Sequence, residues 1–426
     1  MKIAYIILDG AADGLHAPRK SLKEAAKPNI DYIASKSRCG LVYTVGRGIA
    51  PESDAATLSL LGYNPVKYYT GRGPLEALGV GLRLREGYEI ALRANFATID
   101  PSTYRIIDRR VGRNLTSSEA RILASEIDNM NLAGGEGYAR FKSTIGHRGV
   151  LIVGHRKRRI NAMISNTDPA YERKGLISEA LKSFEPVLRR AEPLEESEEA
   201  RLAAELVNEF TDKAVRILDA HPVNRERVSR GLLPANAVLL RDAGDRLPDV
   251  RPIGEWTGFK WAAIAEMPVE RGIARAVGMG VLEVIVEGKS KPELLKEEAG
   301  LLVEGLKQYE AVYAHLKGPD EPGHDGSLEG KVEAIEAIDE FFFPKIMELV
   351  EDGETAVIIT SDHATPWHLK SHSDDPVPLA IYVPGVEGDG FSGFNEEECA
   401  KGSLGVLEGG YNILPTALDI LKRVNS

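Results

Sequence analysis

The sequence predicts an α/β protein with a mainly parallel sheet flanked by helices and a smaller inserted α+β domain. Three observations predict this fold. Short apolar runs alternate with helical patterns near both ends of the chain, the middle lacks that rhythm, and acidic residues and histidines follow several predicted strands. A chain of 426 residues is also longer than a domain with a single hydrophobic core usually is. We therefore expect a discontinuous domain over residues 1–69 and 233–426, and an insert over residues 70–232.

The first elements are typical of a parallel sheet with covering helices. Ile3–Leu8 is a short apolar run, as expected for a buried strand, and Asp9 follows it directly. In open α/β sheets the carboxyl ends of the strands are where ligands bind. Pro28–Ser37 has proline at its start and predicts a short helix. Ser53 and Asp54 precede the next predicted helix.

The middle of the chain changes character. A glycine-rich stretch covers residues 71–82, and strand-like segments follow near residues 91–98 and 150–153. Residues 189–220 combine a charged face with an apolar stripe, which predicts an amphipathic helix. These segments define the expected insert.

The alternation of strands and helices then returns. Predicted strands cover residues 237–240, 311–316, 355–360 and 377–383, and predicted helices cover residues 291–308, 330–350 and 413–424. We expect all of these elements to belong to the sheet domain.

Composition limits the partners and the compartment. The chain carries 53 Lys and Arg against 64 Asp and Glu, and it has no long basic run, which argues against nucleic acid as a partner. The N-terminal apolar run is too short for a membrane span, so we expect a cytoplasmic protein without membrane contact. Two cysteines, Cys39 and Cys399, predict neither a disulfide framework nor a thiolate metal site. The oligomeric state stays open, because no sustained heptad pattern is visible.

Candidate metal ligands gather in loops after predicted strands. Five of the nine histidines lie between His315 and His372, several beside aspartates. Mixed carboxylate and imidazole ligands suit Mn²⁺, Zn²⁺, Fe or Co²⁺ better than Ca²⁺. Two such ions about 3.5–4 Å apart are the usual clamp for phosphoryl displacement. His315 lies inside a strand pattern and is interpreted as a core or supporting residue. The candidate ligands are Asp9, Asp320, His324, Asp362, His363 and His372.

Ser53 has two interpretations. A serine at a helix start is commonly an N-cap. It is also placed to be a nucleophile whose hydroxyl is activated by a metal, with the free N–H groups of the helix end facing the phosphorylated product. The sequence around Ser53 offers no neighbouring Ser-His-Asp arrangement, which favours activation by metal.

The sequence resembles the cofactor-independent phosphoglycerate mutases, most closely their shorter archaeal branch, within the alkaline phosphatase superfamily. The resemblance extends over nearly the whole chain, and its segment around Asp362 and His363 is the most specific. The matching stretches are IILDGAAD, PESDAATLSLLGYNP, GRGPLEALGVG, RANFAT, HPVNRERVSRGLLPANAVLLRDAGD, GIARAVGM, HLKGPDEPGHDG and TSDHATPWHLKSHSDDPVPLAIY.

This resemblance implies a fold, a reaction and a ligand set. It implies an alkaline-phosphatase-like core and the interconversion of 3-phosphoglycerate and 2-phosphoglycerate without 2,3-bisphosphoglycerate. It also implies that Ser53 becomes phosphoserine at a site of two divalent ions, most often Mn²⁺, with Mg²⁺, Co²⁺ or Zn²⁺ in some members. One ion is implied at Asp9, Ser53, Asp362 and His363, and the other at Asp320, His324 and His372.

A phosphoglycerate carries a phosphate and a carboxylate, and both suit the fork of an arginine. Candidate substrate contacts are Arg72, Arg148, Arg241 and Arg271. Arg271 lies near the position where the longer branch of the family has a lysine, so this chain departs from the family there. The insert is the expected lid, because water must be excluded if the phosphoserine is not to be hydrolysed.

Two other functions fit the same residues less well. A serine at a two-metal site also serves a phosphomonoesterase, or a phosphotransferase acting on another small hydroxy acid, as in a homoserine-kinase-like role. A non-catalytic metal-binding scaffold is the other alternative, and the presence of Ser53 with every matched ligand position argues against it.

Overall fold

The computed structural model of the protein describes residues 1–424 and divides into two compact units. The first unit comprises the chain from Met1 to Tyr69 and from Asp249 onward, and the second comprises Thr70–Pro248. The second unit therefore ends at Pro248 and not at the predicted residue 232. The reason is that the strand Ala237–Gly244 (β10), expected in the large sheet, pairs antiparallel with a strand of the second unit.

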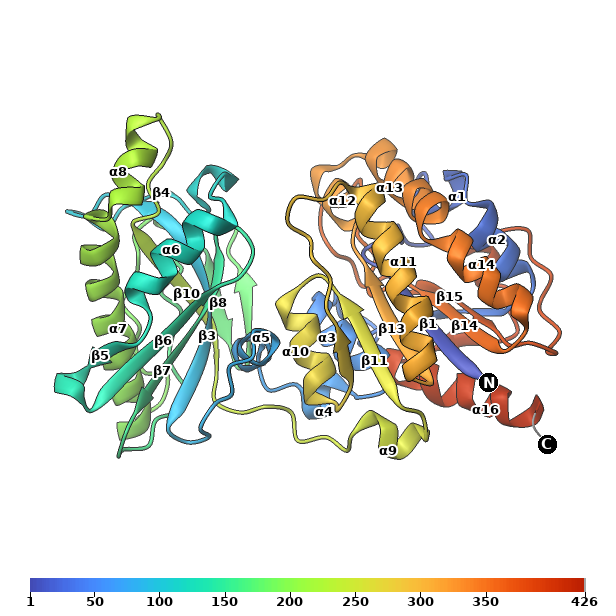
Figure 1. The fold of residues 1–426 in the computed structure, drawn as a ribbon, viewed down its shortest axis with the longest axis horizontal. Coiled ribbons are helices and arrows are strands. Elements are labelled where there is room, and N and C mark those ends of the chain that lie inside the picture. The colour runs from blue at the N-terminus through green and yellow to red at the C-terminus, as the bar shows by residue number, and fades with distance from the viewer. Residues whose placement is uncertain (425–426) are drawn as a thin grey trace. The chain divides into compact units, whose positions relative to one another are not determined.

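Within the described residues, the first unit is built on an eight-stranded sheet (Figure 1). Its order is β12-β11-β13-β1-β14-β15-β2-β16, in which β15 alone runs antiparallel to its neighbours β14 and β2 in the core of the sheet. The strands are β1 (Lys2–Leu8), β2 (Arg38–Val42), β11 (Trp261–Ala265), β12 (Gly280–Leu282), β13 (Ala311–Leu316), β14 (Thr355–Thr360), β15 (Val377–Tyr382) and β16 (Gly405–Leu407).

The register of the three central strands places their carboxyl ends at one edge. In β1, Leu8 lies opposite Leu316 of β13, and Ile7 lies opposite Thr360 of β14, all in parallel pairing. All three strands are buried along their length apart from Lys2, as their apolar sequences predict. The loops that follow them, with their polar residues, therefore leave the sheet side by side.

Two groups of helices cover this sheet. Helices α2, α11, α13 and α14 pack against one another in one group, and α3, α10, η3 and α16 pack in the other. The helices of the unit are α1 (Ser21–Glu24), α2 (Pro28–Ser35), α3 (Ser53–Leu60), α4 (Pro65–Tyr68), α9 (Ile253–Thr257), α10 (Pro268–Ala276), α11 (Lys291–Gln308), α12 (Asp320–Asp325), α13 (Leu328–Phe341), α14 (Phe343–Asp352), α15 (Glu396–Cys399), η3 (Gly410–Asn412) and α16 (Ile413–Val424).

The second unit is an antiparallel sheet with helices on both faces. The sheet order is β10-β3-β7-β6-β5, and β4 pairs with β3. Alternate residues of β3 and β7 face opposite sides, as the two-residue period of a strand requires. Its strands are β3 (Glu89–Ile99), β4 (Ile106–Asp108), β5 (Met130–Leu132), β6 (Gly137–Ser143), β7 (Arg148–His155) and β10, with a separate hairpin of β8 (Tyr171–Lys174) and β9 (Ile177–Ala180).

The larger core of the second unit lies under α6 and α7. In this core, Ile90 and Leu151 of the sheet pack with Leu206 and Phe210 of α7. On the opposite face of the sheet, a smaller cluster joins Ala77 of α5 to Ala91, Val150 and Ile152. The helices of this unit are α5 (Arg72–Gly79), η1 (Val111–Arg113), α6 (Ser117–Ile127), η2 (Ala133–Gly135), α7 (Glu198–Asp219) and α8 (Pro222–Ser229).

Two predicted helices differ from the structure, each next to a proline. The helix predicted over 189–220 begins only at Glu198, because Pro193 lies in the segment before it. The helix predicted over 330–350 is two helices, α13 and α14, and the second begins with Pro344 near its start. Proline removes an N–H donor and is tolerated in the first turn of a helix but not in its interior.

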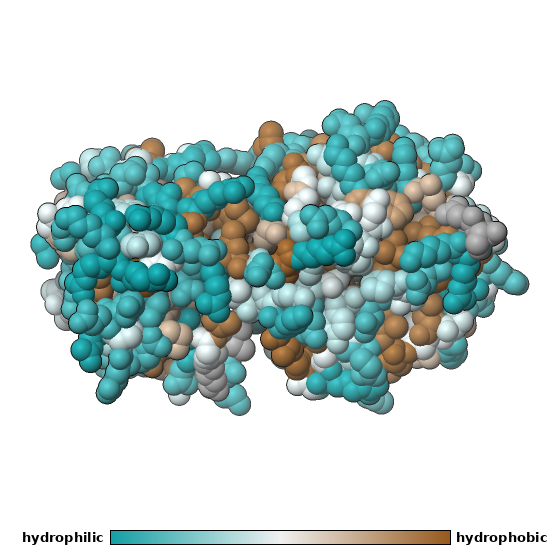
Figure 2. Space-filling view, turned by 90° about the horizontal axis from the view of Figure 1, so that it is seen from below, coloured by the Kyte–Doolittle hydropathy of each residue, from teal (hydrophilic) through white to brown (hydrophobic). Residues whose placement is uncertain are grey.

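The surface seen in Figure 2 is mainly hydrophilic, with apolar residues scattered among charged ones. None of the helices formed by residues 1–424 is both long and apolar enough to cross a membrane.

A buried lysine joins two of the loops at the carboxyl edge of the first unit's sheet. Lys331 of α13 is fully buried, and its Nζ donates to the Ala12 carbonyl at 3.1 Å, to Asp13 Oδ1 at 2.7 Å and to the Thr365 carbonyl at 2.8 Å. Ala12 and Asp13 follow β1, whereas Thr365 follows β14. One ammonium group thus holds the loop after Asp9 against the loop after Asp362.

Replacing Lys331 by methionine is expected to destabilise the first unit by about 3–5 kcal/mol, because the substitution leaves Asp13 buried without its counter-charge. Trp256, Trp261 and Trp367 all lie in this unit, so tryptophan fluorescence during denaturant unfolding measures the loss. Lys345→Met is the control, because Lys345 is about half exposed and pairs only with Glu348 of its own helix. Equal unfolding midpoints for the two variants would contradict the role given to Lys331.

Candidate active site and metal centre

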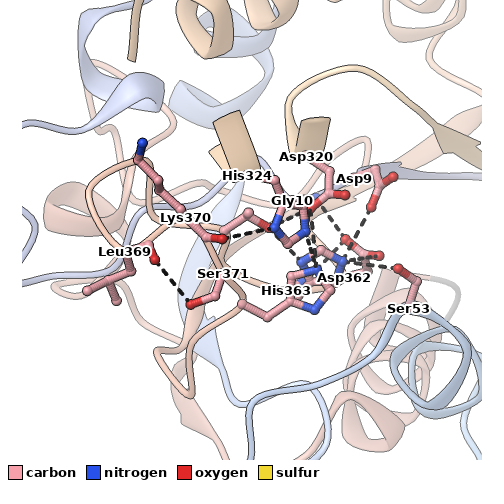
Figure 3. A network of polar contacts seen from close by, with 12 residues as sticks. Asp9, Gly10, Ser53, Asp320, His324, Asp362, His363, Leu369, Lys370 and Ser371 are labelled. Carbon is pink, nitrogen blue, oxygen red and sulfur yellow. Dashed lines mark hydrogen bonds and ion pairs between the residues drawn. The ribbon is translucent and has the colours of Figure 1, made fainter. Parts of the chain in front are cut away.

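The predicted ligands come together at the carboxyl edge of the first unit's sheet (Figure 3). Asp9 follows β1, Asp362 and His363 follow β14, and Asp320 begins α12, the short helix after β13. Asp362 is fixed by its Oδ1, which accepts hydrogen bonds from the backbone N–H groups of Gly10 and His363, both at 3.0 Å. The close approach of the loops thus follows from the parallel register of the strands.

The first ligand set consists of Asp9, Ser53, Asp362 and His363. His363 Nε2 lies 3.1 Å from Ser53 Oγ, 3.2 Å from Asp362 Oδ2 and 3.4 Å from Asp9 Oδ1. Donors that surround one ion at about 2.0–2.2 Å in a tetrahedron are about 3.3–3.6 Å apart. The three distances from His363 Nε2, at 3.1–3.4 Å, are therefore close to the spacing of ligands around a single cation.

The second ligand set consists of Asp320, His324 and His372. His324 Nε2 lies 3.2 Å from His372 Nε2, and Asp320 Oδ1 lies 3.5 Å from the first nitrogen and 3.4 Å from the second. The three atoms form a compact triangle of the kind that a divalent ion completes.

The ring nitrogens on the far side show which atoms are free to bind. His372 Nδ1 lies 2.7 Å from the Pro51 carbonyl, and His324 Nδ1 lies 3.2 Å from the Lys370 carbonyl. A carbonyl can only accept, so each Nδ1 carries a proton and donates it. In the neutral rings both Nε2 atoms then present lone pairs to each other, an arrangement that a cation between them stabilises.

The two ligand sets belong to one centre. His363 Nδ1 lies 3.0 Å from Thr365 Oγ1, which donates to Asp320 Oδ1 at 2.7 Å. The rings of His363 and His372 also stack, with centroids 3.8 Å apart. The compact three-residue groupings of donor atoms in this region are Asp320, His363 and His372, and Asp9, His315 and Asp362.

The carboxylates of the centre are held in the ionised form that binds metals. Burial by itself raises the pKa of Asp9, but the charge of Lys317 and the nearby imidazoles of His315 and His363 hold that pKa well below its usual range. Burial also raises the pKa of Asp320, but the interaction of its carboxylate with His372 outweighs burial, so that the pKa is lowered overall. Both side chains are thus available as anionic ligands at neutral pH.

Ser53 does not serve as the cap of its helix. The N-cap of α3 is Glu52, without a side-chain capping bond, and Ser53 is the first helical residue. Its hydroxyl is half-buried and turned toward His363, as Figure 3 shows. The position leaves the oxygen facing the ligand set, in the first turn of α3, where the Ala55 N–H already donates to Asp54 Oδ1.

Two residues beside the centre, the partly buried Lys317 and the buried Glu270, were not expected from the sequence. Lys317 Nζ lies 2.9 Å from Asp9 Oδ2 and 2.5 Å from Glu270 Oε1. Burial lowers the pKa of Lys317, but the charges of Asp9 and Glu270 outweigh it, so that the pKa is raised overall. Lys317 follows β13 in the same loop as Asp320, which is the one feature of the sequence that could have indicated it. Glu270 comes from α10 and carried no local signal.

Three of the four predicted substrate arginines lie together in the second unit, with an additional arginine that sequence reasoning missed. Arg72 Nε donates to Glu76 at 2.7 Å, and Arg93 Nε lies 3.6 Å from the same carboxylate. Arg241 lies over the ring of Tyr171, 3.8 Å from its centroid. The arginine cluster consists of Arg72, Arg93, Arg148 and Arg241.

The arginine cluster has an excess of positive charge. Burial, together with the charges of Arg72 and Arg241, lowers the pKa of Arg93 to about 9. Burial and Arg72 also lower the pKa of Arg148. Mutual repulsion of this kind is relieved by an anion, so the cluster is a candidate anion site.

Arg271 is placed differently. It belongs to α10 of the first unit, and its guanidinium donates to Glu283 at 3.0 Å and to the Glu266 carbonyl at 3.1 Å. Both of its terminal nitrogens are thus engaged by groups of its own unit, whereas its buried Nε has no hydrogen-bond partner among the described residues.

Comparisons with known proteins point to a single family. A family model described as 2,3-bisphosphoglycerate-independent phosphoglycerate mutase matches residues 34–224. The enzyme of that name from Aeropyrum pernix is 56% identical over 425 residues, which is 99% of this chain and 100% of its own. The enzyme of that name from Pyrobaculum aerophilum is 39% identical over 96% of this chain and 95% of its own.

A solved structure of similar architecture bears the same kind of name. The cofactor-independent phosphoglycerate mutase from Thermoplasma acidophilum is 31% identical and has a TM-score of 0.62, and the match covers 100% of this chain and 100% of that structure's chain. With full-length identity of this order to named relatives, and with the expected ligands gathered at the sheet edge, the chain belongs to the 2,3-bisphosphoglycerate-independent phosphoglycerate mutases, on a mixed α/β fold with a mostly parallel sheet.

Proposed function

We propose that this protein interconverts 3-phosphoglycerate and 2-phosphoglycerate, as an isomerase of glycolysis and gluconeogenesis in the cytoplasm, without 2,3-bisphosphoglycerate. The observation that carries the proposal is the position of Ser53 Oγ, 3.1 Å from His363 Nε2 within the first ligand set. A hydroxyl among metal ligands, at a helix N-terminus, fits a nucleophile that receives and returns a phosphoryl group.

The donor sets fit two divalent ions, and Mn²⁺ is the ion we propose. Asp9, Ser53, Asp362 and His363 would hold one ion, and Asp320, His324 and His372 would hold the other. When bound, such ions neutralise phosphate oxygens and lower the pKa of a coordinated hydroxyl. Mixed oxygen and imidazole donors favour Mn²⁺, Zn²⁺ or Co²⁺ over a purely oxygen-seeking ion.

The protein groups then have distinct tasks in the transfer. Ser53 Oγ gives up its proton and attacks phosphorus in line, the bond from phosphorus to the glycerate oxygen breaks on the opposite side, and that oxygen takes up a proton to become a hydroxyl. The N–H groups of the first turn of α3 face the phosphoserine and stabilise its charge. Glycerate turns, and its other hydroxyl attacks the phosphoserine, which returns the group and regenerates the Ser53 hydroxyl.

We further propose that the arginine cluster of the second unit binds an anionic group of the substrate. Arg148→Ala is expected to raise KM about 10–100-fold, the effect of losing one hydrogen bond to a charged group worth about 1.5–3 kcal/mol. Arg148→Lys should recover part of this loss, because it keeps the charge but not the fork. Arg158→Ala, at an exposed pair with Glu198 in the same unit, is the control. An unchanged KM in Arg148→Ala would contradict this role.

The proposed function is tested by a coupled assay on 3-phosphoglycerate with metal-stripped and Mn²⁺-restored protein, in the absence of 2,3-bisphosphoglycerate. We expect no turnover without metal and full mutase turnover after Mn²⁺ is restored. Phosphate release faster than formation of 2-phosphoglycerate would favour a phosphomonoesterase instead. Transfer of phosphate to homoserine in place of isomerisation would favour the kinase-like alternative.

A further inference from the structure

A second imidazole faces the first ligand set. His315 lies in β13, is fully buried, and has its Nε2 3.3 Å from Asp362 Oδ2 and 3.8 Å from Asp9 Oδ1. The same two oxygens lie 3.2 Å and 3.4 Å from His363 Nε2. Both imidazoles are therefore directed at the same pair of carboxylate oxygens, one from β13 and the other from the loop after β14.

The three atoms contributed by His315, Asp9 and Asp362 lack hydrogen bonds to one another and to the rest of the described chain. Asp9 Oδ1, Asp362 Oδ2 and His315 Nε2 are all buried, and none has a hydrogen-bond partner among residues 1–424. Leaving one such atom unpaired costs about 1–3 kcal/mol, and more for charged groups. Three converging atoms of this kind are the arrangement that a bound cation satisfies, and they form one of the compact donor groupings described above.

The other side of the His315 ring faces a buried carboxylate and a tyrosine hydroxyl. His315 Nδ1 lies 3.6 Å from Glu270 Oε1 and 3.4 Å from the Tyr313 hydroxyl. Glu270 is almost fully buried and also contacts Lys317. Imidazoles that bind metals commonly turn their second N–H toward a carboxylate, which fixes the ring and keeps the other nitrogen unprotonated toward the ion.

We propose that His315 Nε2 is a direct ligand of the ion held by Asp9, Asp362 and His363, and that Glu270 positions the His315 ring. The inference rests on the proposed two-ion centre and adds a residue to it. A second imidazole makes the first site softer than a carboxylate-rich one, so His315 would favour Co²⁺, Mn²⁺ or Zn²⁺ over Mg²⁺.

The direct test is the structure of the unmodified full-length protein loaded with Mn²⁺. We expect anomalous density at the first site with His315 Nε2 within about 2.0–2.3 Å of the ion, which is ordinary nitrogen–metal bonding distance. An ion bound by Asp9 and Asp362 with His315 Nε2 more than about 3 Å away would overturn the inference and leave the proposed function intact. A protein that binds no ion at all would instead contradict the proposed function.

The second test is titration of metal-stripped protein with Co²⁺, followed by visible absorption and calorimetry. His315→Asn is expected to weaken Co²⁺ binding at one of two sites by at least about 100-fold and to change its absorption spectrum, while Glu270→Gln weakens it about 10–100-fold. Mg²⁺ affinity should fall less in both variants. His155→Asn, at a buried histidine of the second unit, is the control and should bind like the unmodified protein. Variants that fold normally and keep both Co²⁺ affinities and spectra would overturn the inference.

Discussion

Ser53→Ala is expected to reduce kcat for 3-phosphoglycerate by at least about 10⁴-fold, since the loss of a nucleophile removes the covalent route entirely. The substitution deletes only one oxygen at a half-buried position, so the fold is expected to persist. The measurement is steady-state turnover in the coupled assay, with the metal content of the same sample determined by plasma mass spectrometry.

The matched control is Ser59→Ala, because Ser59 lies in the same helix and its hydroxyl only accepts a hydrogen bond from the Tyr411 N–H. We expect turnover close to that of the unmodified protein. A Ser53→Ala protein that retains ordinary turnover would show that the phosphoryl group passes through another residue or moves without a protein intermediate.

Asp320→Asn is the second change with a large expected effect. The substitution removes the carboxylate that lies within 3.5 Å of both His324 and His372, so the second ion should bind weakly or be lost. One ion is worth several kcal/mol of transition-state stabilisation, which corresponds to a loss in kcat of roughly 10³-fold or more. Metal analysis should find one ion per chain where the unmodified protein has two.

Asp325→Asn provides the control for this experiment. Asp325 ends the same short helix, α12, but is exposed, and the substitution is chemically identical. We expect two ions and normal turnover. If Asp320→Asn also kept two ions and normal kcat, the second ligand set would be assigned to the wrong residues.

The central strands and the ligands that follow them could be predicted from the sequence. Buried parallel strands are short continuous apolar runs, and Ile3–Leu8, Ala311–Leu316 and Thr355–Thr360 are of this kind. Parallel register brings the ends of such strands together, so the residues after them meet without any further information. The pairing of Asp362 with His363 therefore pointed to the edge of the sheet at which the candidate ligands lie together.

The sheet to which β10 belongs could not be predicted in this way. Ala237–Gly244 is buried throughout, and a buried run has the same pattern in a parallel sheet as in an antiparallel one. Its partner, β3, lies more than a hundred residues earlier, and nothing local in the sequence identifies that partner. The end of the second unit was misplaced for the same reason.

The supporting residues of the centre were harder to find than its ligands. His315 lies inside a strand, where a polar residue is ordinarily interpreted as a core or supporting residue, and only the register beside Asp9 and Asp362 gives it a partner. Glu270 and Lys317 meet through the packing of α10 against the sheet, which no spacing in the sequence encodes. Arg93 alternates with apolar residues along β3 and resembles any exposed strand position until the fold is known.

The most direct measurement is a rapid quench of the Mn²⁺-loaded protein with phosphoglycerate labelled in its phosphate, followed by peptide mapping. The account predicts that the label appears during turnover on the peptide containing Ser53, and that it disappears when the substrates are exhausted or removed. Turnover at the full rate with no labelled protein, or with the label on any residue other than Ser53, would contradict it.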